Sequence, residues 1–261
     1  GRSDHSLSAI QRGGGSPPLV HAPHVVVDGA LVRGVAVLGD VHADDGAPGE
    51  SPEILREGFD AEFVRDNALA ISGLLVKKMG GPSVKPYQPA GYWEFLNFPK
   101  RDYPQDTGEK LYRRGMYTWW QRMFLHPSLL NFDAPAHEEC TAERTRSNTP
   151  QQALTLMNDV TYVEASRVFA ARIMRECDGD VPTRISWAFK VALSREPTAK
   201  ELPVLAELYE KQRQRYLTDA PAADALTSAG AYPGADGLKL ADLAAWTSVA
   251  RTILNLHETI T

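Results

Sequence analysis

The residues best suited to chemistry lie between positions 126 and 140, where histidines and carboxylates are close together in the sequence. The densest run is His137-Glu138-Glu139-Cys140, and on a helix its first and last residues would share a face because positions three apart are neighbours. With Glu139 or Asp133 they could bind zinc, and a metal-bound water would then be the nucleophile, with a carboxylate as the base. The candidate catalytic residues are therefore His126, Asp133, His137, Glu138 and Glu139.

Two other interpretations compete with this metal site. The run can be a polar loop with one half-buried cysteine, because free cysteine usually behaves as a small core residue. A serine triad of Ser128, His126 and Asp133 is also open, since triads are defined by geometry and not by spacing. Ser128 follows a proline, however, and both residue types are common in turns. The sequence contains no Gly-x-Ser-x-Gly or Ser-x-x-Lys motif, so an ordinary α/β-hydrolase is not expected.

Aromatic residues crowd into the same part of the chain, from position 83 to 140, with arginines among them. Aromatic rings can stack on a sugar, and arginine and carboxylate groups can bind its hydroxyls through paired hydrogen bonds. Paired carboxylates could add glycosidase chemistry. The alternative is an aromatic core beneath a long loop, with the arginines paired to acids. The candidate substrate-binding residues are Tyr92, Trp93, Arg113, Arg114, Trp119, Trp120 and Arg122.

Composition limits the possible partners. The chain has 261 residues, a formal net charge of -5 and 43% hydrophobic residues, so we expect a folded protein and not a non-specific nucleic-acid binder. The sequence has no run of 18 apolar residues, so no membrane span is predicted. The polar, Gly-rich start lacks the apolar region of a signal peptide, and the chain as expressed is expected to be cytoplasmic. A small molecule or a saccharide is the expected ligand.

Cofactor expectations follow from the few metal-binding residue types. With two cysteines and no Cys-x-x-Cys-His motif, we expect neither a disulfide framework nor a c-type haem. A divalent metal, calcium or zinc, is the cofactor that we consider. Asp40, Asp44 and Asp45 are oxygen donors of the kind that calcium prefers, although no EF-hand loop is present. Solvated turn residues are the alternative interpretation of these aspartates.

The chain divides near residue 59 into two parts of different character. The first 58 residues hold ten of the 20 glycines, and their short valine runs could form two or three strands. This leader has little apolar bulk to offset its ordering entropy, so a disordered or out-of-frame segment is the alternative. From residue 59 to 261 apolar residues recur at helical spacing. The expected fold is mainly α: an irregular helical domain at 59–261 with a long aromatic-rich loop segment, after a poorly structured or short-stranded leader at 1–58.

Local signals predict where the helices begin and end. We expect a first helix at about 60–77 and a second at about 109–124. Thr149 before Pro150 predicts a helix start, with a break at Asn158-Asp159 before a longer helix. Another helix follows Pro182, and Thr198-Ala199-Lys200-Glu201 has the pattern of a capping box at the start of the next. Residues 218–237 are expected to be a loop, before a last helix at about 238–257.

Several ordered motifs carry a family resemblance. They are Gly80-Gly81-Pro82-Ser83-Val84, the run from Leu111 to Trp120, Phe132-Asp133-Ala134-Pro135, and Ser147-Asn148-Thr149-Pro150-Gln151-Gln152-Ala153-Leu154. Through them residues 59–261 resemble the planctomycete secreted domain one family. The resemblance implies a C-terminal helical module of unknown reaction in secreted or periplasmic proteins, often fused to cytochrome-c-like domains and linked to polysaccharide metabolism.

The resemblance supplies no established catalytic residues, and His257-Glu258 stands where an acidic pair is expected. The leader does not resemble the upstream part of the family, so we expect a C-terminal fragment behind an unrelated leader, as in a clone from environmental DNA. Such a clone would fit a hydrolase that acts on an ester or lactone. We keep that activity as the alternative to a binding or scaffold module.

Overall fold

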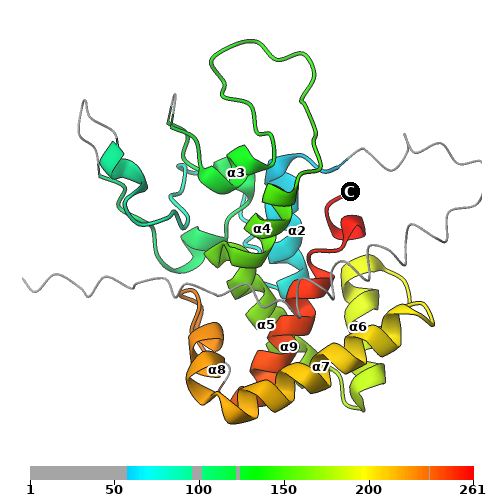
Figure 1. Cartoon of the computed structure of the whole chain (residues 1–261). Helices are drawn as coiled ribbons and strands as arrows, with labels where there is room; N and C mark the ends of the chain where they lie inside the picture. Colours follow the sequence, from blue (N-terminus) through cyan, green and yellow to red (C-terminus); the bar gives the residue numbers. More distant parts are fainter. Residues whose placement is uncertain (1–57, 96–101, 122–123, 235) are drawn as a thin grey trace, which may run out of the picture.

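The computed structural model describes residues 58–95, 102–121, 124–234 and 236–261, and Figure 1 shows their arrangement. Within these ranges the chain forms α-helices, short 3-10 turns and isolated β-bridges, and it forms no strand. The expectation of a mainly α domain is confirmed, while the predicted strands of the leader lie outside the described residues. No helix in the described ranges is both long and apolar enough to cross a membrane.

The core forms around two helices, α5 (Val160–Glu176) and α9 (Leu240–Ile253), which lie side by side at the centre of Figure 1. Two further helices, α2 (Ala61–Ser72) and α7 (Glu201–Thr218), pack against this pair. Trp246 of α9 is fully buried and packs on Tyr209 of α7, with ring centroids 4.7 Å apart. Burial of this apolar surface is the main force that holds the four helices together.

The predicted start signals are confirmed at three helix ends. α4 (Pro150–Asn158) begins with a full capping box, in which Thr149 and Gln152 each accept a hydrogen bond from the backbone N–H of the other. Asp159 ends α4 and caps α5. Thr198 and Glu201 exchange the same two bonds at the start of α7. Each cap satisfies an N–H group that no helical carbonyl can reach.

The described residues form three more helices: α3 (Pro127–Asn131), α6 (Val181–Leu193) and α8 (Ala220–Thr227). The expectation of a loop at 218–237 is wrong where α8 forms. Asp219 caps α8 by accepting from the N–H of Ala222, and proline in the first turn suits a helix start.

The first helix is shorter than the predicted 60–77, because α2 ends at Ser72. Gly73 follows it in the left-handed region, with φ of 83°, and its N–H bonds back to the end of the helix. This is a common way for a helix to end, and glycine adopts it without a steric penalty. Gly80-Gly81-Pro82 therefore lies in the following loop and is not the stop signal.

The predicted helix at about 109–124 is wrong, and a buried arginine gives the reason. Among the described residues of this range, two short 3-10 turns form in place of an α-helix. The guanidinium of Arg65, which is 1% exposed, donates to the carbonyl oxygens of Leu111 and Arg113 at 2.6 and 2.7 Å. The N–H of Val76 donates to the carbonyl oxygen of Tyr112, the residue between them. A helix would need these carbonyls for its own backbone bonds, so tertiary pairing replaces it.

Candidate functional site

A long loop connects α3 to α4 (Figure 1), and hydrogen bonds join its two ends. The carboxylate of Asp133 accepts hydrogen bonds from the backbone N–H of Ser147 at 2.7 Å and from its hydroxyl at 2.6 Å. The side chain of Gln152, in the first turn of α4, donates to the same carboxylate oxygen at 3.5 Å. We call the segment 134–146 the closed-base loop. Surface loops with joined ends often carry function.

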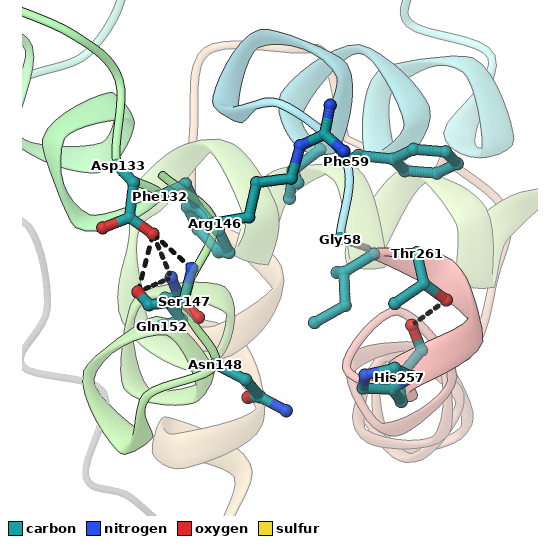
Figure 2. A pocket seen from close by; sticks show the side chains of 12 residues that line it. Gly58, Phe59, Phe132, Asp133, Arg146, Ser147, Asn148, Gln152, His257 and Thr261 are labelled. Atoms are coloured by element: carbon teal, nitrogen blue, oxygen red, sulfur yellow. Dashed lines mark hydrogen bonds between the residues drawn. The ribbon is translucent and has the colours of Figure 1, made fainter. Parts of the chain in front are cut away.

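A cavity of about 260 Å³ lies beneath this base, between α4, the start of α2 and the C-terminal residues. Figure 2 shows the hydrogen-bonded cluster of Asp133, Ser147 and Gln152 on one side and His257 with Thr261 on the other. Two aromatic rings also contribute to the wall, Phe59 and the buried Phe132. The cavity thus combines apolar faces with a carboxylate, a hydroxyl, amides and an imidazole.

Two polar side chains of the cavity wall have no hydrogen-bond partner among the described residues. In the part of the chain that the structure describes, neither the amide of Asn148 nor the ring of His257 has a hydrogen-bond partner, although both line the cavity. Arg146 differs, because its guanidinium forms an ion pair with Asp60 at 3.3 Å. Asn148 and His257 are therefore the groups most available to a ligand.

The predicted catalytic residue His126 does not reach this cavity. It is 2% exposed at the start of α3, and its Nε2 lies 2.7 Å from the carbonyl oxygen of Tyr87. Burial, and then the positive charge of Arg65, lower the pKa of His126 to about 4. The bond to a carbonyl requires the proton on Nε2, so His126 is a neutral core donor and not a surface base. The triad with Ser128 and Asp133 does not form, because Asp133 bonds Ser147 instead.

The other predicted catalytic residues gather around a second, more open cavity. Asp133, His137, Glu138 and Glu139 all line this space of about 310 Å³ within the closed-base loop. The ring of His137 stacks on Trp120, with centroids 4.4 Å apart. Among the described residues no three His, Cys, Asp or Glu side chains are grouped so that they could hold a metal ion. The zinc set built on His137 and Cys140 is thus not assembled.

The predicted substrate-binding aromatics pack mainly against one another. Trp93 contacts the rings of Tyr92, Tyr103 and Trp119 at centroid distances of 6.4, 5.6 and 5.6 Å. The Tyr92 hydroxyl donates to the carbonyl of Leu125 at 3.0 Å. None of these rings lines either cavity. This arrangement matches an aromatic cluster under a loop, and Arg122 lies outside the described residues.

Two predicted substrate-binding arginines, Arg113 and Arg114, bind other parts of the protein. Arg113 is 6% exposed, donates to the carbonyls of Pro82, Lys78 and Gly80, and stacks on a tyrosine ring. Arg114 forms an ion pair with Asp66 at 3.4 Å. These contacts hold the segment around residue 113 against α2 and the 78–82 loop.

The cavity residues Ser147, Asn148, Gln152 and His257 were not among the predicted site residues. The signal for the first three was present, because they belong to the Ser147–Leu154 motif that carries the family resemblance. For His257 the sequence gives no such signal beyond its place in the His257-Glu258 pair. Its place in the wall depends on the chain end returning to the start of α2, where Phe59 donates its N–H to Ile260.

The fold and cavity define a helical module with a small polar site, and comparison with known proteins gives its family. Residues 52–209, more than half of the chain, match the PSD1 family, described as a protein of unknown function (DUF1553). The chain therefore belongs to this family. No curated protein and no solved structure matched it.

Proposed function

We propose that this protein binds a hydroxyl-rich small molecule, such as one unit of a saccharide, in the cavity beneath the closed-base loop. The observation that carries this proposal is the convergence of Asn148 and His257, both with free hydrogen-bonding capacity, on one cavity with aromatic walls. Small-molecule sites typically combine apolar walls with a few placed polar groups. A volume of about 260 Å³ suits a single sugar-sized unit.

The family resemblance suggests the kind of protein in which such binding would occur. We propose that the module serves an extracytoplasmic protein that is linked to polysaccharide metabolism. In that setting the bound unit would be an end or a branch of a polysaccharide, since the cavity is small. The aromatic cluster around Trp93 would then stabilise the domain and would not contact the sugar.

Hydrolysis of an ester or lactone is the competing hypothesis, because Ser147, Asp133 and His257 line the same cavity. The bonding pattern favours binding over this reaction. The Ser147 hydroxyl donates to Asp133 at 2.6 Å, whereas an activated serine donates to an imidazole that the acid in turn orients. A carboxylate without an intervening imidazole is a weak base for a serine hydroxyl.

Isothermal titration of the protein with a panel of neutral, amino and acidic monosaccharides tests the proposal. We expect saturable binding of at least one sugar, weakened about tenfold in Asn148→Ala, which corresponds to the loss of about one hydrogen bond. Gln151→Ala is the matched control, because Gln151 is exposed on the next turn and does not line the cavity. Equal affinities in the two variants, or no saturable binding by the wild type, would contradict the proposal.

The same protein samples decide the competing hypothesis. Turnover of p-nitrophenyl esters or lactones would be measured with and without EDTA for the wild type and for Ser147→Ala. Turnover that disappears in Ser147→Ala, with circular dichroism unchanged, would replace the binding role with a hydrolytic one. Turnover that requires a metal would instead direct attention to the second cavity, around His137.

A further inference from the structure

A third cavity lies on a different part of the domain and has an unusual concentration of arginine. It has a volume of about 450 Å³ and is formed by the C-terminal half of α5, the end of α2 and the 232–234 segment. Arg167, Arg172 and Arg175 all line it. Arg172 and Arg175 are neighbours on the surface of α5 because they lie three residues apart, and Arg167 lies about two helical turns before Arg175. Glu176 is the acidic residue of this wall.

Arg167 forms the buried side of the cavity. Its side chain is 3% exposed, and its two terminal nitrogens donate to the carbonyls of Tyr232 and Pro233 at 2.7 and 3.2 Å. The carboxylate of Glu164 lies 4.0 Å away, but that group also accepts from the N–H of Tyr232 at 2.6 Å and from the hydroxyl of Tyr112 at 3.0 Å. In the described part of the chain the Nε of Arg167 has no partner.

The other two arginines stand at the open side. Arg172 donates to the carbonyl of Ile71 and binds both carboxylate oxygens of Glu176, at 2.8 and 2.9 Å. Arg175 is exposed, and its only hydrogen bond within the described ranges is to the carbonyl of Asp236 at 3.2 Å. Most of the five N–H groups of Arg175 are therefore available.

We propose that this cavity binds an oxyanion, a phosphate or sulfate group, between Arg175, Arg172 and Arg167. Planar guanidinium groups bind such anions through paired hydrogen bonds, and a concave wall of several arginines favours an anion over a neutral ligand. In the absence of the anion, the carboxylate of Glu176 accepts two hydrogen bonds from Arg172. Glu176 therefore competes with the anion for these donors. This site is independent of the cavity beneath the closed-base loop, because the two cavities share no residue.

The proposal predicts opposite effects for two neighbouring substitutions. Arg175→Gln should weaken anion binding about tenfold, because it removes a guanidinium with free donors. Glu176→Gln should tighten binding by several fold, because it releases two donors of Arg172 and removes a negative charge. A purely structural role for these residues would not produce this reversal. Arg215→Gln on α7 is the matched control, since it changes the same charge outside this cavity.

The experiment is titration of the full chain with sodium phosphate and with sodium sulfate at pH 7, with ionic strength held constant by sodium chloride. Circular dichroism and the melting temperature of each variant establish that it is folded. Saturable binding that follows the predicted order supports the site, and the tighter anion identifies a phosphate or a sulfate ester as the natural group. No saturable binding of either anion, equal weakening by Arg175→Gln and Arg215→Gln, or weaker binding in Glu176→Gln overturns the proposal.

Discussion

The carboxylate of Asp133 holds Ser147, 14 residues further along the chain, through bonds of 2.7 Å to its backbone N–H and 2.6 Å to its hydroxyl. This pair closes the base of the loop that carries His137, Glu138 and Glu139, and both residues line the cavity of about 260 Å³ beneath it. Asp133 also lines the second cavity, so one side chain connects the two candidate sites. It adopts a left-handed backbone conformation, with φ of 59°, which aspartate tolerates better than most residues.

Substitution of Asp133 should therefore destabilise the protein for two separable reasons. Asp133→Gly should cost about 1 kcal/mol through the lost hydrogen bonds, whereas Asp133→Ala should cost about 1 kcal/mol more because alanine is strained at positive φ. Urea unfolding measures both values. In both variants trypsin should cut faster after Arg144 and Arg146, because the loop ends are no longer joined. Equal costs for the two substitutions would contradict the role assigned to the backbone conformation.

Local signals in the sequence were sufficient to predict three of the helix ends. The capping boxes at Thr149 and Thr198 and the break at Asp159 each depend on residues within four positions of one another, and all three are present. The helix predicted at about 109–124 failed because Arg65 binds carbonyls 46 and 48 residues away. No local pattern reports such a pairing, and tertiary hydrogen bonds outweigh helix propensity there.

The candidate site was likewise predictable where it depends on residue type and not where it depends on contacts between distant segments. Asp133 was identified from its residue type, but its partner Ser147 lies across a long loop and His257 lies near the other end of the chain. His126 has the residue type of a catalytic base, yet its burial depends on how the Tyr87 segment packs over α3. Residue type identifies groups that can do chemistry, whereas the fold decides which of them share a cavity.

Gly115 should not accept a side chain. A Cβ at this position would lie 2.9 Å from the Cα and 3.0 Å from the carbonyl oxygen of Glu62 in α2, and these backbone atoms cannot move aside easily. The N–H of Gly115 also donates to Asp66 at 2.6 Å, which holds the two segments together. We expect Gly115→Ala to lower the free energy of unfolding by about 2 kcal/mol.

Gly234→Ala is the matched control for this experiment, because no atom lies within 4 Å of a Cβ built there. Its effect on the urea midpoint should be within about 0.5 kcal/mol of zero. A Gly115→Ala variant as stable as Gly234→Ala would show that α2 and the 113–118 segment are not packed as closely as described.

Acid should destabilise the protein through His126. Its pKa is about 4 in the folded chain, because burial disfavours the charged form, whereas the unfolded value is near 6.5. The unfolded state therefore binds more protons between these values, so stability falls as the pH drops from 6.5 toward 4, by about 3 kcal/mol in all. The raised pKa values of Asp66 and Glu164 act in the opposite direction, since burial raises both.

The histidine contribution is isolated by comparison with His126→Gln. The amide can keep a hydrogen bond to the carbonyl of Tyr87 but does not titrate, so the variant should lose most of the stability change between pH 6.5 and 4. His137→Asn is the control, because His137 is exposed and asparagine tolerates its φ of 59°. Urea unfolding at half-unit pH intervals measures the three profiles. Parallel wild-type and His126→Gln profiles would contradict the assignment.

Glu201 should be the most sensitive charged residue of the α7 region. Its side chain is fully buried, and Arg195 binds both of its oxygens at 2.8 and 2.9 Å and also reaches Glu258 near the chain end. Burial opposes the charge of Glu201, but the bonds from Arg195 and Thr198 prevail and lower its pKa to about 2. Glu201→Gln should lower the free energy of unfolding by about 3 kcal/mol, because one partner of a buried pair is removed.

Glu196→Gln supplies the comparison, since Glu196 forms an exposed pair with Lys190 whose loss should cost less than about 1 kcal/mol. A low folded pKa also means that the Glu201 contribution is present above pH 4.5 and is lost as the pH falls toward 2. The gap in stability between the wild type and Glu201→Gln should therefore close in this range. A gap that stays constant from pH 7 to pH 2 would show that packing, and not the ion pair with Arg195, accounts for the effect of the substitution.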